Sequence, residues 1–209
     1  MSTDRVDPLA LAPSTASAWN IANALTVVRL VLVPFFAAAL LAHGGERDGW
    51  RITAWALFAL ASWTDRLDGQ LARSRNLVTS FGKLADPIAD KALTGAALVG
   101  LSVLGELPWL VTAVVLVREL GVTLLRFWVI RHGVIPASRG GKLKTLLQGV
   151  AIGLYVLPLT GLLASGRAVV MVLAVVVTVV TGVDYVARAL TLRQTSDRAA
   201  MKRARRAAR

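Results

Sequence analysis

Residues 65–90 read DRLDGQLARSRNLVTSFGKLADPIAD and place four aspartates at fixed intervals in an otherwise apolar chain. Asp65 and Asp68 are three residues apart, and Asp86 and Asp90 are four apart, so each pair lies on one face of a helix. A carboxylate at the centre of a membrane helix costs about 2.5–3.5 kcal/mol on insertion scales. Four of them need compensation. The pattern therefore predicts two helices that face each other around a bound cation.

The composition indicates an integral membrane protein. The chain has 209 residues, of which 56% are hydrophobic, and a mean hydropathy of +0.62. Soluble domains contain about 45–50% apolar residues. The apolar residues form blocks of about 20, the length that spans ~30 Å of hydrocarbon, and alternating strand patterns are absent. We expect an all-α protein with six transmembrane helices, at about 21–42, 50–73, 82–104, 108–131, 145–164 and 168–192.

Short connections and basic residues organise the rest of the chain. Turns are predicted at Gly44-Gly45, Leu107-Pro108 and Ser165-Gly166. We expect a polar lead-in over 1–19, the six-helix domain over 20–192 and a basic tail over 193–209.

The net charge of +12 gathers in the second-to-third and fourth-to-fifth connections and in the tail. The positive-inside rule then places both termini and the aspartates on the cytoplasmic side of the cell membrane. In such a chain, basic residues orient the protein and meet anionic membrane lipids, and a nucleic-acid partner is not expected. The sequence has no cysteine and two histidines, which argues against a thiol nucleophile or a histidine metal site.

Small residues accompany the aspartates on both predicted helices. Gly69 and Ala72 share the face of the first aspartate pair, and Gly82 lies one turn before Asp86. The absence of bulk lets a nucleotide approach the helix backbone, and Arg73 beside it can neutralise a phosphate. Hard divalent cations take oxygen ligands, and two such ions could clamp a pyrophosphate between them.

Two other interpretations use the same residues. The aspartates could only pair with neighbouring Lys and Arg residues, but salt bridges do not need small residues in register. A divalent-cation transporter or channel would use them as a permeation site. That class predicts acidic residues distributed through the membrane depth, whereas here they cluster near one side.

The pattern D-x-x-D-G-x-x-A-R-x8-G-x3-D-x3-D resembles the signature of the CDP-alcohol phosphotransferase family, and residues 65–90 match it at every fixed position. The flanking segments are most similar to the bacterial phosphatidylglycerophosphate synthase branch of that family. The similar stretches are Asn20 to Arg29, Arg118 to Arg126, Gly133 to Ser138 and Gly141 to Gln148. Ala22 stands where that branch usually has proline.

The resemblance implies the reaction and the site residues. It implies transfer of a phosphatidyl group from CDP-diacylglycerol to sn-glycerol 3-phosphate with release of CMP, and it makes a homodimer plausible. Two ions, Mg²⁺ or Mn²⁺, would be held by Asp65, Asp68 and Asp86 and by Asp65, Asp86 and Asp90, with Asp90 also the general base. The donor would contact Asn23, Thr26, Gly69, Ala72, Arg73, Thr79 and Gly82.

Basic residues after the aspartates are candidates for the phosphate of the acceptor. An arginine inside an apolar helix is costly and is a functional candidate by default. The set comprises Arg118, Arg126, Arg139, Lys142 and Lys144. Phosphatidylglycerol, giving cardiolipin, and inositol phosphate remain open as alternative acceptors. Asp184 and Arg188, four residues apart, are expected to form a structural ion pair.

Overall fold

The computed structural model describes the backbone of residues 21–74, 80–129 and 139–207, and the side chains of residues 24–65, 88–125 and 140–193. Within these ranges all regular secondary structure is helical, as the sequence predicts. Six α-helices and one short 3-10 helix follow in order: α1 Ile21–Leu41, η2 Ala42–Gly45, α2 Asp48–Ser74, α3 Ser80–Val103, α4 Trp109–Val129, α5 Arg139–Val156 and α6 Gly161–Ala207.

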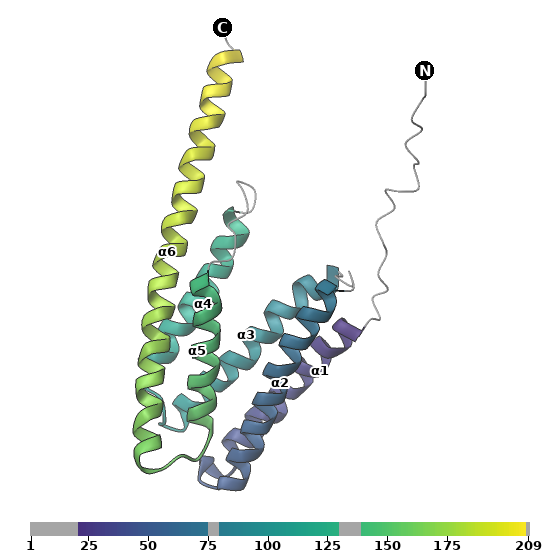
Figure 1. The fold of residues 1–209 in the computed structure, drawn as a ribbon, viewed down its shortest axis with the longest axis vertical. Coiled ribbons are helices and arrows are strands. Elements are labelled where there is room, and N and C mark those ends of the chain that lie inside the picture. The colour runs from purple at the N-terminus through teal and green to yellow at the C-terminus, as the bar shows by residue number, and fades with distance from the viewer. Residues whose placement is uncertain (1–20, 75–79, 130–138, 208–209) are drawn as a thin grey trace.

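The six α-helices run alternately up and down, so α1 begins and α6 ends at the same end of the molecule (Figure 1). Helix α1 packs mainly against α2 and α3, and α6 packs mainly against α4 and α5. Contacts of α2 with α5, and of α3 with α4 and α5, join these two groups. Helices α2 to α5 therefore meet in the middle of the bundle.

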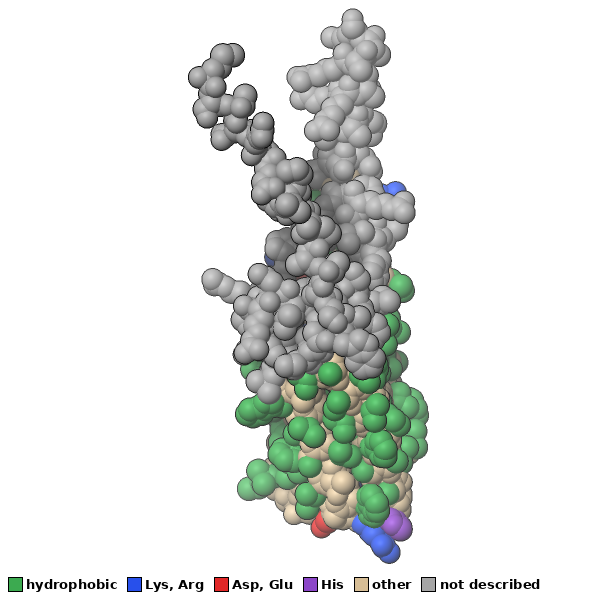
Figure 2. Space-filling model, turned by 90° about the vertical axis from the view of Figure 1, so that its right-hand side faces the viewer, with side chains coloured by type: hydrophobic (Ala, Val, Ile, Leu, Met, Phe, Trp, Pro, Cys, Tyr) green, Lys and Arg blue, Asp and Glu red, His purple; other side chains and the backbone are tan. Residues whose placement is uncertain are grey.

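Apolar side chains form both the core and the outer surface. In the core, the rings of Phe36 and Phe58 lie 5.7 Å apart between centroids, and Leu98, Leu101 and Ile152 are fully buried. Large apolar side chains also cover the outside of the helices, and on the face shown in Figure 2 charged and histidine side chains of described residues lie below them, at the lower end. An apolar exterior of this extent is typical of a membrane or interaction surface.

Two segments of the described chain, Ala24–Gly45 and Gly161–Arg193, are long and apolar enough to cross a membrane. Of the remaining four helices, α2, α3 and α4 match the predicted segments within two residues, whereas α5 begins six residues and ends eight residues before the expected segment 145–164. Their role as membrane spans stays a prediction.

Two of the three predicted turns are confirmed. Gly44 and Gly45 adopt φ values of +66° and +73°, a left-handed conformation that glycine tolerates. They lie in the turn that connects α1 to α2. Gly105, with φ +74°, follows the end of α3, and α4 begins directly after Pro108.

The third predicted turn, at Ser165-Gly166, is wrong, because both residues lie inside α6. The chain turns at 157–160 instead. Pro158 has no N–H and disfavours helical geometry at the preceding residue, and Gly161 opens α6 at φ +62°. Helix α5 is therefore shorter at its end than the expected segment 145–164. Helix α6 continues to Ala207, through most of the stretch expected as a basic tail.

A buried arginine closes the lower end of the bundle. Arg51, on the first turn of α2, is 3% exposed. Its Nε donates to the Val156 carbonyl at 2.8 Å and its Nη2 to the Tyr155 carbonyl at 2.5 Å, which satisfies the C-terminal end of α5. Its Nη1 contacts Glu106 at 3.0 Å, and Glu106 also pairs with Arg167 of α6 at 2.7 Å. We call Arg51, Glu106 and Arg167 the lower clasp.

We predict that Arg51→Met destabilises the protein by about 3–5 kcal/mol, because it leaves two helix-end carbonyls without a hydrogen-bond donor and removes one of the two cations that pair with Glu106. Thermal unfolding of the purified protein in detergent measures this as a lower Tm. Arg188→Met is the matched control. Arg188 forms an exposed ion pair with Asp184 at 2.9 Å, as the sequence predicts, and such a pair contributes about 0.3–0.5 kcal/mol. Equal Tm shifts for the two variants would contradict the proposed importance of the lower clasp.

Candidate active site

A cavity of about 300 Å³ lies where α1 to α5 come together. Its lower wall is apolar and includes Phe58, Leu93 and Ile152. Each of the five helices also contributes at least one ionisable side chain to the wall. In chain order these are Arg29, Asp65, Asp90, Lys91, Glu119 and Lys144. Charge in an apolar bundle is costly unless it is paired or binds a ligand, so this cavity is the candidate site.

The cavity unites the two halves of the aspartate pattern. Asp65 reaches it from α2 and Asp90 from α3, and Asp90 is exposed. The two carboxylates therefore face one space from neighbouring helices, as the sequence predicts. Their oxygen atoms suit a hard divalent cation. Among the side chains that the structure describes, no group of three or more possible metal ligands is gathered, and the remaining two predicted ligands lie outside the described side chains.

Arg29 holds Asp65 from the side of α1. The Arg29 Nη1 lies 2.7 Å from Asp65 Oδ1, and the side chain of Arg29 is 1% exposed whereas that of Asp65 is 42% exposed. A buried guanidinium in this position orients the carboxylate while leaving the rest of it accessible. The sequence analysis assigned Arg29 no role. The sequence feature that could have identified Arg29 as functional is its position as an arginine inside the apolar first helix.

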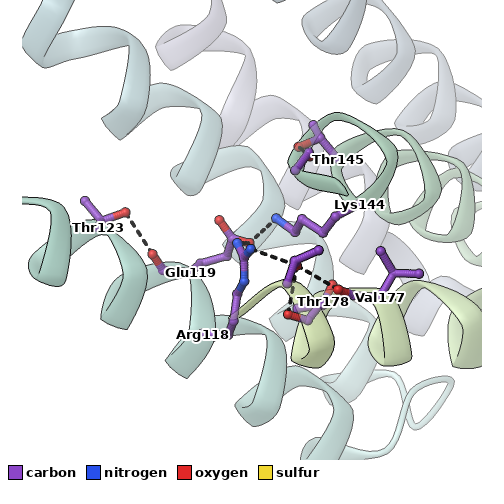
Figure 3. Close-up of polar contacts among 9 residues, drawn as sticks. Arg118, Glu119, Thr123, Lys144, Thr145, Val177 and Thr178 are labelled. Carbon is purple, nitrogen blue, oxygen red and sulfur yellow. Dashed lines mark hydrogen bonds and ion pairs between the residues drawn. The ribbon is translucent and has the colours of Figure 1, made fainter. Parts of the chain in front are cut away.

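Glu119 is the centre of a second charged cluster, which links α4, α5 and α6 (Figure 3). Its Oε1 accepts from Lys144 Nζ and, at 3.2 Å, from Arg118 Nη1. All three side chains are largely buried. Two cations share one carboxylate, so the cluster keeps one net positive charge beside the cavity. The sequence analysis assigned Glu119 no role.

Helix α6 fixes the direction of the Arg118 side chain. The Arg118 Nη2 donates to the Thr181 hydroxyl at 3.0 Å. A Cβ at Gly182 would lie 3.0 Å from Arg118 Cγ, so the glycine leaves room for the arginine stem. By contrast, a Cβ at Gly121 on α4 would meet nothing within 4 Å. Thr181 and Gly182 are contributors that the sequence analysis did not identify.

The structure brings some of the predicted acceptor-phosphate residues to the cavity and leaves others away from it. Lys144 is buried and lines the wall. Arg118 is not among the lining residues and reaches the cavity only through Glu119. Lys142 is exposed. The side chains of Arg126 and Arg139 lie outside the described residues.

The predicted donor-binding residues lie mostly outside the described side chains. Thr26 is the exception, and it is buried in α1, one turn before Arg29. The backbones of the others belong to α1, α2 and α3, except for Thr79, whose backbone is also outside the described ranges. The predicted donor-binding residues whose side chains lie outside the described residues are Asn23, Gly69, Ala72, Arg73, Thr79 and Gly82. The same holds for two predicted metal ligands, Asp68 and Asp86.

Comparison with known proteins agrees with the family resemblance of the sequence. A sequence model of the family described as CDP-alcohol phosphatidyltransferase matches residues 19–180. A Mycobacterium tuberculosis protein named probable phosphatidylglycerophosphate synthase is 61% identical over 171 residues, which cover 82% of each chain.

Two more distant relatives carry a more specific name, CDP-diacylglycerol–glycerol-3-phosphate 3-phosphatidyltransferase. The Bacillus subtilis protein is 37% identical over 80% of this chain and 93% of its own length. The Rickettsia felis protein is 35% identical over 79% of this chain and 93% of its own. Asp65 and Asp90, one aspartate from each half of the pattern, line one cavity of the helical bundle, and these matches show that the chain belongs to the CDP-alcohol phosphatidyltransferase family.

Proposed function

We propose that this protein transfers the phosphatidyl group of CDP-diacylglycerol to sn-glycerol 3-phosphate, giving phosphatidylglycerophosphate and CMP in phospholipid biosynthesis. The observation that carries the proposal is the cavity that joins Asp65, Asp90 and the buried Lys144. Carboxylates suit the metal that a pyrophosphate donor needs, and a buried cation suits a phosphate on the acceptor. The names of the relatives, one of them 61% identical, support the same reaction.

Members of the family use divalent metal ions. In our proposal two ions, Mg²⁺ or Mn²⁺, are held by Asp65, Asp68, Asp86 and Asp90. The described part of the site fits this assignment, because Asp65 and Asp90 present carboxylates to the cavity from facing helices and Arg29 orients the first of them. Bound ions of this kind stabilise negative charge on the attacking and leaving oxygens of a phosphoryl transfer.

The donor is proposed to lie along the small-residue faces of α2 and α3. Gly69, Ala72 and Gly82 allow its diphosphate to approach the helix backbones, and Arg73 and Thr79 contact the phosphates. Asn23 and Thr26 of α1 close over the nucleotide. Thr26 is buried one turn before Arg29, which is the described residue of α1 that lines the cavity.

Asp90 is proposed to act as the general base. A hydroxyl is a weak nucleophile at neutral pH, so a carboxylate within hydrogen-bond reach speeds the attack. The acceptor oxygen forms a bond to the phosphorus on the lipid side of the donor, the bond from that phosphorus to the oxygen of CMP breaks, and the hydroxyl proton passes to the Asp90 carboxylate. Its exposure in the cavity leaves it accessible to the acceptor.

Lys144 is proposed to bind the acceptor phosphate directly. Arg118 contributes through Glu119, because it compensates the carboxylate that would otherwise neutralise Lys144. Arg126, Arg139 and Lys142 complete the basic surroundings in this proposal. The basic cluster favours an acceptor with a free phosphate, such as glycerol 3-phosphate or inositol phosphate, over phosphatidylglycerol.

The family is membrane-bound. We place this member in the cell membrane as a multi-pass protein with both termini in the cytoplasm. The start of α1 and the end of α6 lie at the same end of the bundle (Figure 1), and the basic residues of the sequence gather in the connections and tail expected there. Membrane lipids then surround the apolar exterior.

The direct test is CMP release by the purified protein in detergent with CDP-diacylglycerol and Mg²⁺ or Mn²⁺. We expect release with sn-glycerol 3-phosphate and none with phosphatidylglycerol or inositol phosphate, and Asp86→Ala serves as the blank. Release with a different acceptor alone would retain the metal chemistry and overturn the acceptor. Folded, metal-binding protein that releases no CMP with any acceptor would favour cation transport instead.

We predict that Asp90→Asn lowers kcat by about 10²–10⁴-fold, because the amide cannot accept the hydroxyl proton. Calorimetry with CDP-diacylglycerol in detergent micelles should show that the donor still binds. Asp184→Asn is the matched control, since Asp184 is paired with Arg188 on the outside of α6, and its kcat should be unchanged. Near-normal turnover of Asp90→Asn would remove Asp90 from the role of base.

We predict that Gly182→Leu raises the KM for glycerol 3-phosphate by about tenfold, equivalent to ~1.4 kcal/mol. The new side chain occupies the space of the Arg118 stem and disturbs its contact with Glu119. The KM for the donor should change little. Gly121→Leu makes the same change where a Cβ meets nothing within 4 Å, and it should leave both KM values unchanged. An equal rise in donor KM would show a general distortion of the site.

A further inference from the structure

Gln148 is a buried amide on the cavity wall that the proposed reaction does not yet use. It lies on α5 and is 5% exposed. It lines the same cavity as Asp65, Asp90 and Lys144. Its Oε1 is buried and has no hydrogen-bond partner among the residues that the structure describes. A buried carbonyl oxygen without a donor is uncommon in proteins and calls for a specific explanation.

An apolar residue would be the more stable choice at this position if only packing mattered. The cavity wall nearby is formed by apolar side chains such as Phe58, Leu116 and Ile152. Replacing an unpaired buried amide by an apolar group of similar shape removes its desolvation cost. The amide is therefore best explained by a hydrogen-bond donor on a ligand that fills the site.

The position of Gln148 relative to Lys144 indicates what kind of ligand carries this hydrogen-bond donor. The two residues are four apart on α5, so they lie on the same face with a rise of about 6 Å between them. Both line the cavity. One side chain offers a cation for a phosphate, and the other offers a neutral acceptor for a hydroxyl. A small polyol phosphate carries both groups within this reach.

We propose that Gln148 accepts a hydrogen bond from the secondary hydroxyl of the acceptor, and thereby selects polyol phosphates that carry a hydroxyl between the phosphate and the attacking primary hydroxyl. The inference rests on the proposed function, because it concerns the acceptor of that reaction. A neutral amide suits this task, since a carboxylate at the same place would repel the acceptor phosphate.

Discrimination of this kind has a clear physical basis. A site whose buried polar group is satisfied only by the substrate hydroxyl rejects an analogue that lacks it, because the protein group is then left unpaired. The suitable analogue is 3-hydroxypropyl phosphate. It keeps the phosphate and the primary hydroxyl of glycerol 3-phosphate and lacks only the secondary hydroxyl.

The experiment compares kcat/KM for the two acceptors by CMP release, in the wild type and in Gln148→Leu. We expect the wild type to prefer glycerol 3-phosphate by about 100-fold, the scale that corresponds to leaving one buried acceptor unpaired. The variant should lose most of this preference. Its kcat/KM for glycerol 3-phosphate falls, while its kcat/KM for 3-hydroxypropyl phosphate stays within about twofold.

Thermal unfolding separates recognition from a structural role. Gln148→Leu should unfold at a Tm equal to or above that of the wild type, since it removes an unpaired buried amide. A lower Tm with an unchanged preference would show that the amide serves packing, or a bound water, and would overturn the proposal. A rise in the donor KM alone would place the amide against the donor and would also overturn it.

Gln148→Glu provides a second variant that retains the hydrogen-bond acceptor. It should keep the preference for glycerol 3-phosphate while lowering kcat/KM for both acceptors, because its charge repels the phosphate they share. Loss of the preference in this variant would contradict the role of a hydrogen-bond acceptor. If the wild type releases CMP with glycerol 3-phosphate but neither variant behaves as described, only this inference fails. If the wild type does not use glycerol 3-phosphate, the proposed function fails with it.

Discussion

A charge inside an apolar helical bundle must find a partner, and this constraint accounts for the positions of the helices around the cavity. Arg29 of α1 reaches Asp65 of α2. Glu119 of α4 holds Lys144 of α5 together with its own neighbour on α4, Arg118. Removing one partner of such a buried pair costs far more than an exposed pair contributes. The charges that the reaction is proposed to use therefore also hold the helices together.

The two ends of the bundle use charge differently. At the lower end, Arg51, Glu106 and Arg167 of the lower clasp pair with one another, and Arg51 donates hydrogen bonds to the last carbonyls of α5. In the cavity, the carboxylates of Asp65 and Asp90 remain accessible, and one net positive charge is left around Glu119. The charges of the lower clasp therefore join helices to one another, whereas those of the cavity are available to a phosphorylated ligand.

Much of this arrangement could be predicted from the sequence, because it depends on local spacing. The helix-face positions of Asp65 and Asp90 and the basic character around Lys144 follow from periodicity and composition. The turn between α5 and α6 was misplaced, because apolar residues flank both Pro158 and Ser165 and hydropathy alone cannot choose between them. The contacts of Glu119 with Lys144 and of Arg118 with Thr181 depend on how distant helices pack, which a single sequence does not specify.

Gly182 has a consequence for how the last helix finds its place. Residues 175–180 are all valine except for Thr178, and a surface so uniform can pack against a neighbour in several nearly equivalent positions along its axis. A different alignment of α6 would place a residue with a side chain beside the stem of Arg118, where even a Cβ would lie 3.0 Å from Arg118 Cγ. Gly182 thus fixes the axial position of α6 relative to α4. When the helices associate, it allows α6 to pack against α4 in one alignment.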